Sequence, residues 1–178
     1  MNRLMVIGLF LVAMLLPGPV ACEAKSAVFV RAQASIQRVL EEMSGQLNRF
    51  EEIQRNLTRS SRNNDAYDEE KNMWISVILA VTTIASVCEY ENDLLSLFLD
   101  LNTKRRPYFY DVRIQSLNSS ILQIKILKEQ IRINYSLISI RPEEKALFEE
   151  INRAIDVSVL LLTDSLKTIS TLKQATKK

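Results

Sequence analysis

The chain has 178 residues, of which 47% are hydrophobic and 25% are charged, and this composition is ordinary for one globular domain with a sizeable core. Because 23 basic residues stand against 21 acidic ones, the net charge is only +2, and no strong field favours binding to nucleic acid. Histidine is absent, which excludes histidine-based catalytic triads, histidine-ligated haem, and the usual zinc and di-iron sites of helical bundles.

Residues 1–24 have the three regions of a secretory signal peptide. Arg3 precedes an apolar run that extends from residue 4 to residue 16, and prolines and small residues follow the run. Cleavage before residue 23 or before residue 25 would remove Cys22, whereas a lipoprotein pathway would keep Cys22 as an acylated anchor. We therefore predict a cleaved signal peptide and an exported protein, periplasmic or secreted. Membrane association through lipidation of Cys22 is the alternative.

The first predicted helix runs from 26 to 60. Large apolar residues recur in it at intervals of seven, which places them on one face of a helix; they are Phe29, Ile36, Met43, Phe50 and Leu57. Gly45 interrupts this pattern, and a glycine inside a helix costs about 1 kcal/mol relative to alanine. It indicates either a kink or the close approach of another helix, or else a tolerated surface glycine.

The second predicted helix, from 68 to 101, contains the uncharged stretch 72–88, around which the rest of the chain is arranged. Its apolar seam has helical spacing and consists of Trp74, Val77, Val81, Ile84, Cys88, Leu95 and Phe98. The acidic residues that follow the stretch make the second half amphipathic; they are Glu89, Glu91, Asp93 and Asp100. A membrane-spanning role for 72–88 is the alternative, but its 17 residues are fewer than the roughly 20 that a bilayer requires.

The third and fourth predicted helices run from 107 to 139 and from 142 to 172. The seam of the third is Ile114, Leu117, Ile121, Ile124, Ile131 and Ile138, and its charged residues, Arg113, Lys125, Lys128, Glu129 and Arg132, are placed outside that seam. The seam of the fourth is Phe148, Ile151, Ile155, Leu162, Ile169 and Leu172. The polar tail after residue 172 is expected to fray.

Four apolar patterns of similar length, joined by short connections, predict an all-α fold with an up-down-up-down antiparallel four-helix bundle. Strand signals are missing from the sequence. The bundle would form a single domain from residue 25 to residue 178, after the signal peptide.

The sequence offers no pattern that carries enzyme chemistry. Gly45 is the only glycine left after signal removal, so no glycine-rich loop can hold phosphates. Adjacent acids such as Glu41-Glu42 lie on predicted polar faces, where neighbouring side chains diverge by about 100°. We therefore assign no catalytic, cofactor-binding or metal-binding residue, and we expect a protein that is not an enzyme and needs no cofactor.

One candidate interaction surface is a tract at the start of the third helix that combines three cations with three aromatic residues: Lys104, Arg105, Arg106, Tyr108, Phe109 and Tyr110. Such a mixture suits anionic lipid headgroups or an acidic partner. In the alternative, the charges complement the end of the preceding helix and the aromatic residues close the end of the bundle.

A second candidate is an interface patch on the second helix, opposite the Trp74 seam, formed by Ile75, Leu79, Thr82 and Ser86. A four-helix bundle should leave this face exposed to solvent, and exposed apolar patches mark interfaces. A homodimer or a different protein partner would cover it, unless the first and third helices wrap far enough to bury it.

Cys88 shares the seam with Trp74 and is predicted to be a buried, unreactive thiol with a raised pKa. An intermolecular disulfide is the alternative, since no partner cysteine remains in the processed chain.

Together these patterns favour an exported, non-enzymatic helical bundle that acts through protein–protein contacts, as a structural, accessory or sensor-like module. Its partner would be an unknown protein or a second copy of itself, and not nucleic acid. The alternatives are a membrane-associated or lipid-anchored envelope protein, and a binder of an apolar small molecule in the bundle core.

Overall fold

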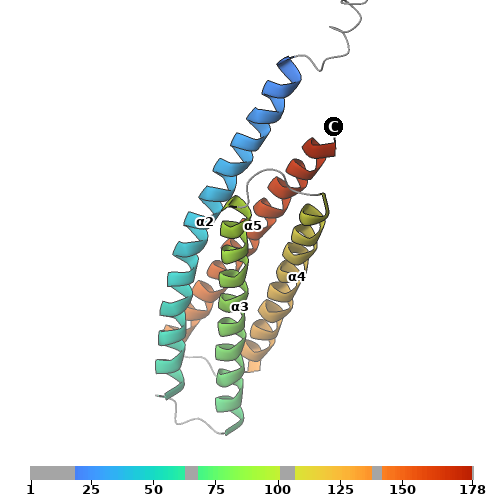
Figure 1. Cartoon of the computed structure of the whole chain (residues 1–178). Coiled ribbons are helices and arrows are strands. Elements are labelled where there is room, and N and C mark those ends of the chain that lie inside the picture. Colours follow the sequence, from blue (N-terminus) through green and yellow to red (C-terminus); the bar gives the residue numbers. More distant parts are fainter. Residues whose placement is uncertain (1–18, 63–67, 101–106, 138–141, 178) are drawn as a thin grey trace, which may run out of the picture.

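A computed structural model of the chain describes residues 19–62, 68–100, 107–137 and 142–177, with side chains for 27–61, 71–99, 108–137 and 144–176. Each of these four segments is one α-helix (Figure 1). The helices are α2 (Pro19–Arg62), α3 (Asp68–Asp100), α4 (Pro107–Leu137) and α5 (Pro142–Lys177). The described residues contain no strand, so the prediction of an all-helical protein is confirmed for this part of the chain.

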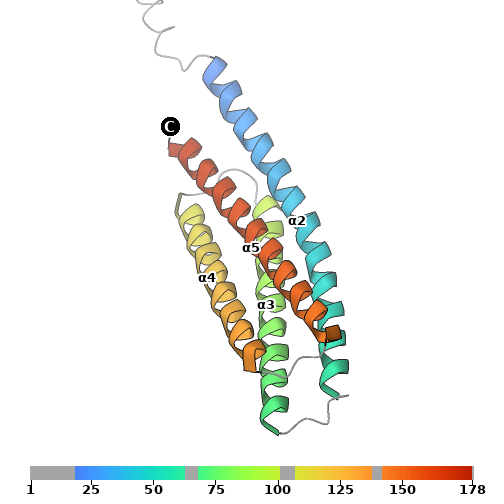
Figure 2. The ribbon, with the colours of Figure 1, turned by 180° about the vertical axis from the view of Figure 1, so that it is seen from behind.

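The four helices pack side by side as a bundle. Each of α2 and α4 lies against both α3 and α5, and α3 also touches α5 across the centre. Figures 1 and 2 show this arrangement from opposite sides, with the first turns of α2 extending beyond the other helices. Helices α3 and α4 therefore share one long side of the bundle, and α2 and α5 share the opposite side.

The helices differ from the predicted ranges mainly at their ends. Helix α2 begins at Pro19 instead of residue 26, and α5 continues to Lys177 instead of fraying after residue 172. Helix α4 is described as far as Leu137, and residues 138 and 139 of its predicted range lie outside the described residues. The predicted signal sequence up to residue 18 and the cations of the 104–106 tract lie outside the described residues.

Gly45 is a surface glycine in an uninterrupted helix. A Cβ atom added to it would meet nothing within 4 Å, so no other helix approaches it. The neighbouring Ser44 Oγ donates to the Leu40 carbonyl at 2.9 Å, a bond within the same helix. Of the two interpretations of this position, the structure favours the tolerated surface glycine.

Most residues of the predicted apolar seams form the core; Phe29 and Ile114 are partly buried, and Ile138 lies outside the described residues. On α3 all seven seam residues, from Trp74 to Phe98, are at most 1% exposed. Aromatic rings close both ends: the Phe148 ring centroid lies 4.1 Å from that of Tyr135 and 5.7 Å from that of Trp74, and at the other end Phe98 and Tyr110 meet edge-on at 5.9 Å. Such ring pairs contribute about 0.5–1.5 kcal/mol each beyond their area burial.

Two leucines on α5 test how much of the stability comes from this core. Leu162 is fully buried, whereas Leu160 is 57% exposed on the same helix. Leu162→Ala should lower the free energy of unfolding by about 2–5 kcal/mol, because it removes buried methyl groups and leaves a cavity. Leu160→Ala should change it by less than about 0.5 kcal/mol. Denaturant unfolding of both variants measures the difference, and similar losses would contradict the assigned core.

Candidate functional site

The aromatic residues of the cation-rich tract separate into two kinds. Tyr108 and Phe109 are 76% and 41% exposed, but Tyr110 is only 1% exposed and packs against Phe98. Tyr110 is thus unavailable as a surface contact, and it closes the end of the bundle as the alternative interpretation expected. Burial follows from its spacing, because Tyr110 lies seven residues before Leu117 on the inward face of α4.

The predicted interface patch on α3 is exposed in the single chain. Ile75 and Leu79 are 52% and 61% exposed, and Thr82 and Ser86 also face solvent. Helices α2 and α4 do not wrap far enough to cover them. Thr82 and Ser86 also line one wall of a groove of about 450 Å³ between α2 and α3, whose other wall includes Ser44, Asn48 and Glu51.

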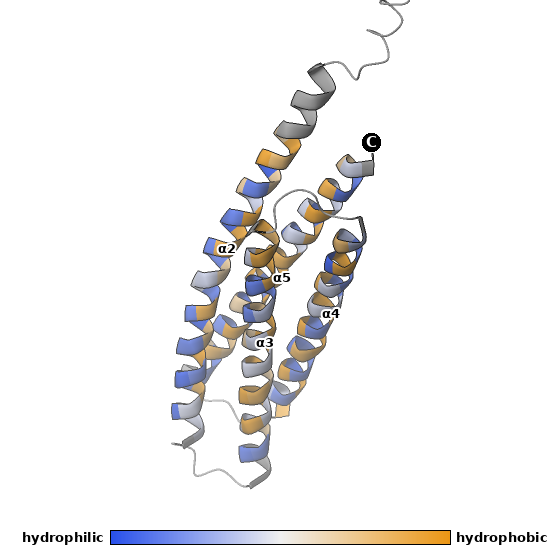
Figure 3. Cartoon of the chain, in the orientation of Figure 1, coloured by the Kyte–Doolittle hydropathy of each residue, from blue (hydrophilic) through white to orange (hydrophobic). Residues whose placement is uncertain are grey.

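The exposed apolar surface extends well beyond this patch. Among the described residues thirteen large hydrophobic side chains are exposed, and eleven of them lie on α3 and α4. We call this surface the α3–α4 face; it comprises Ile75, Leu79, Tyr90, Leu97, Tyr108, Phe109, Val112, Leu122, Ile126, Ile133 and Leu137. Figure 3 shows hydrophobic residues interspersed with hydrophilic ones along both helices. Ile75 and Leu79 on α3 and Tyr108 and Phe109 on α4 were predicted from the sequence as surface contacts. The other α4 residues of this face were not, because α4 was assigned a single inward seam.

The exposed ion pairs between helices lie away from the α3–α4 face, although Lys71, Glu89 and Asp93 are exposed on α3. The exposed ion pairs that join helices within the described residues all involve α5, such as Arg49 with Glu150 at 3.6 Å and Lys128 with Asp156 at 2.6 Å. On α3 no charge occurs from residue 72 to residue 88. The hydrogen bonds across the α3–α4 boundary at this level come from neutral groups: Ser76 Oγ accepts from the side-chain amide nitrogens of Gln130 and Asn134, at 3.3 and 3.0 Å.

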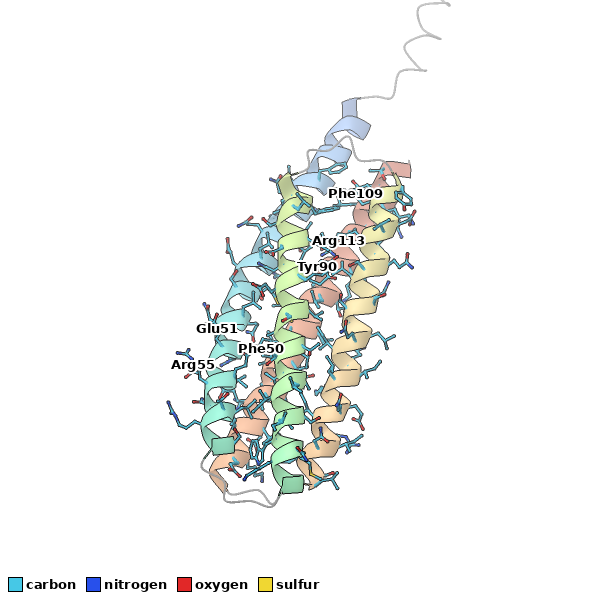
Figure 4. The ribbon with its side chains drawn as sticks, turned by 60° about the horizontal axis from the view of Figure 1, so that its bottom comes forward. Phe50, Glu51, Arg55, Tyr90, Phe109 and Arg113 are labelled. Carbon is cyan, nitrogen blue, oxygen red and sulfur yellow. The ribbon has the colours of Figure 1, made fainter. Side chains whose placement is uncertain are left out.

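Beneath this face lies a buried charge pair. The Glu91 carboxylate on α3 is fully buried and forms an ion pair with the guanidinium of Arg113 on α4, which is 5% exposed. Ser120 and Ser116 donate their hydroxyl hydrogens to Glu91 Oε1 at 2.6 and 3.0 Å, and Arg113 Nη2 donates to the Glu91 carbonyl at 3.1 Å. Figure 4 labels Arg113 together with Tyr90 and Phe109 in this half of the bundle.

The sequence analysis placed both members of this pair on polar faces, and that assignment is wrong. Glu91 occupies the position missing from the α3 seam, between Cys88 and Leu95, and Arg113 lies four residues before Leu117 on α4. The spacing of three and four residues along the α3 seam predicts that position 91 is buried, even though a charged residue occupies it. Single-helix patterns could not show that each charge has a partner on the neighbouring helix.

The pair joins α3 to α4 with strict geometry. Two buried charges cost several kcal/mol of desolvation each, which is offset only when the partners and their hydrogen bonds are in place. Arg113 Nε nevertheless has no hydrogen-bond partner. Because the carboxylate needs the guanidinium and the serine hydroxyls in place, the cluster can fix the alignment of α3 and α4. Fixing an alignment is the best-attested role of buried polar groups in helical assemblies.

Cys88 lies one turn before Glu91 and is buried, as predicted. Burial raises the pKa of its thiol from 9.0 to about 11, while a hydrogen bond with Ser158 on α5 lowers the pKa and the Glu91 charge raises it further. The reactive form of cysteine is the thiolate, so the thiol is chemically quiet near neutral pH.

Among the described residues there is no cluster of side chains that could hold a metal ion, and there is one candidate membrane span. No three side chains of His, Cys, Asp or Glu come close enough there to hold a metal ion. One segment, Lys71–Leu99, is long and apolar enough to cross a membrane, but the core helix of a soluble bundle meets the same criterion. Helix α3 buries its seam against three other helices, and 33% of the most apolar part of this segment is buried.

Removing one member of the buried pair should cost more than removing both. Arg113→Met leaves the Glu91 charge buried without a partner and should lower the free energy of unfolding by about 3–5 kcal/mol. The double variant Glu91→Met with Arg113→Met should recover most of that loss. Arg132→Met, which removes an exposed ion pair with Glu129, is the control and should leave stability nearly unchanged. Additive losses in urea unfolding would contradict the coupling.

The raised pKa of Cys88 makes stability depend on pH. Because the folded state holds the thiol proton more tightly than the unfolded chain, the stabilisation is complete below pH 9 and is lost as the pH rises toward 11. At pH 11 the loss should reach about 2 kcal/mol. The contribution of the thiol is the difference between the unfolding free energies of the wild type and of Cys88→Ala, measured between pH 8 and pH 11. All other groups titrate equally in the two proteins and cancel in this difference. Parallel curves would show that the thiol titrates normally.

Comparison of the chain with known protein families, with curated proteins and with solved structures finds no match. The geometry of its own residues is therefore the guide to its function.

Proposed function

We propose that this protein is an exported, non-enzymatic helical bundle that acts through protein–protein contacts made by its α3–α4 face. The observation that carries the proposal is the position of the exposed hydrophobic residues, which gather on one side of the bundle and leave the opposite side to charged pairs. Isolated surface hydrophobic residues are normal, whereas a continuous apolar side is typical of an interaction surface.

The export part of the proposal rests on the sequence. A cleaved segment at residues 1–24 would release a single domain that begins near residue 25, whereas acylation of Cys22 would anchor the same domain to a membrane. We further propose the up-down-up-down antiparallel topology. The sequence colours in Figure 1, which run in opposite directions along successive helices, support it.

The alternative functions have less support. A membrane-spanning α3 would require its seam to leave the aromatic and aliphatic residues that pack on it, such as Phe148 beside Trp74. A ligand in the apolar core would need a cavity among the seam residues, but the groove of about 450 Å³ lies on the outside and is lined mainly by polar side chains. An apolar ligand has little to gain there.

Site-specific photo-cross-linking tests the contact surface. A photo-reactive amino acid replaces Ile126 on the α3–α4 face or, as the matched control, Leu160 on α5; both side chains are about 60% exposed. In the cells that produce the protein, position 126 should give discrete protein adducts, of this chain with itself or with another protein, and position 160 should not. Equal adducts at both positions, or none at 126, would refute the proposed contact surface.

A further inference from the structure

We propose that the occupant of the α3–α4 face is a second copy of the chain, placed by a two-fold axis that crosses α3 at Thr82 and α4 near Ile126. In this dimer α3 packs antiparallel on the partner's α3, and α4 packs antiparallel on the partner's α4. The inference rests on the proposed function and deepens it by naming the partner and its register.

The face is large enough for a stable dimer. Its eleven large hydrophobic side chains are 41–76% exposed, and together they present on the order of 1,000 Å² of apolar surface. The largest apolar patch of a typical monomer is about 300–600 Å², and a standard interface buries about 800 Å² per partner. An equal face is therefore large enough to cover most of it.

The charges on the outer side of α3 are self-complementary. Lys71, Thr82 and Asp93 are spaced by eleven residues, which is close to three helical turns, so they lie on one side of α3. Among the described residues neither Lys71 nor Asp93 forms an ion pair. An antiparallel copy centred on Thr82 brings each Lys71 opposite the partner's Asp93, and places Leu79 over the small side chains of Ala85 and Ser86.

The register of α4 against α3 gives the position on α4 that corresponds to Thr82. Ser76 bonds to Gln130 and Asn134, and Glu91 bonds to Ser116 and Ser120, so the two contact levels fix α4 against α3. Between those levels Thr82 stands at the height of Ile126, which is 60% exposed. One axis perpendicular to both helices therefore brings Ile126 of each copy against its symmetry mate.

The chemistry of the face suits a copy of itself better than a lipid surface. Helices that lie on membranes carry many lysines and arginines around the apolar side. Here the edge carries Glu89 and Asp93 as well as Lys71, and the centre has no charge. In a two-fold contact the centre of the surface packs against the centre of the partner's surface. A charge there would lie beside the same charge of the partner and be repelled. An uncharged centre avoids this repulsion.

Charge reversal tests the register on the exported protein by sedimentation velocity and equilibrium. The wild type should be a dimer. Lys71→Glu and Asp93→Lys should each raise the dimer dissociation constant about tenfold, because each places like charges together at two symmetric positions. The double variant should return to within about threefold of the wild type. Arg153→Glu, an exposed change on α5, is the matched control and should leave dimerisation unchanged.

Two further variants address the centre of the face. Ile126→Cys should form a disulfide-linked dimer when air oxidises the two thiols, with loss of two protons and two electrons to oxygen, whereas Leu160→Cys should not. Leu79→Glu combined with Ile126→Glu should leave a folded monomer, with helical circular dichroism and cooperative unfolding retained.

Several outcomes would overturn the dimer. A wild-type monomer at every soluble concentration would do so, and so would a dimer that responds to neither charge reversal. A monomer whose position 126 still cross-links to another protein would refute self-association but leave the proposed function standing. Binding of a monomer to phosphatidylcholine vesicles, lost in Ile126→Glu, would identify lipid as the occupant and refute both proposals.

Discussion

The buried contact between Glu91 and Arg113 sets the constraint on which the rest of the structure depends. Apolar seams tolerate sliding, because one leucine or isoleucine replaces another at the next turn, but a buried ion pair does not. A shift of α3 along α4 by one turn, about 5.4 Å, would separate the carboxylate from the guanidinium and from both serine hydroxyls. The Glu91–Arg113 ion pair is therefore compatible with only one alignment of α3 along α4.

A fixed alignment inside the bundle also fixes the pattern on its outside. Because Glu91 stands level with Ser116 and Ser76 with Asn134, the outward residues of both helices take defined heights relative to each other. Hydrophobic residues on α3 and α4 thereby form one continuous side instead of two unrelated stripes. The polar cluster in the core and the apolar surface above it both depend on the same alignment of α3 and α4.

Much of this fold follows from periodicity. The uncharged stretch on α3 and the seven-residue recurrence on α2 were sufficient to predict four helices and most of the core, since burial follows apolar spacing. The outer face of α3 was predicted for the same reason. Helix ends were less predictable: α2 starts at Pro19 and α5 extends to Lys177, although nothing in the apolar pattern requires either.

The features that periodicity missed share one cause. Arg113 was expected on the surface because charge usually means exposure, and its burial depends on a carboxylate 22 residues earlier in the chain. Leu122 and Ile133 were overlooked because α4 is apolar on two sides, and assigning one seam explained most of its hydrophobic residues. Each case depends on how two helices pair, and pairing is a property of the three-dimensional structure that a single-helix pattern does not contain.

A bundle that is apolar on one whole side needs a means of limiting its own association. An uncharged surface alone would allow copies to stack in several alignments, and open-ended contacts lead to fibres or precipitates. The charges at the edge of α3 act against this, because Lys71 at one end and Asp93 at the other are matched only in the antiparallel alignment and are opposed by like charges in the parallel one. In the proposed dimer the centre of the face is covered and is not open to a third copy. The proposed two-fold symmetry would account both for the missing charge at the centre and for the charges retained at the edge.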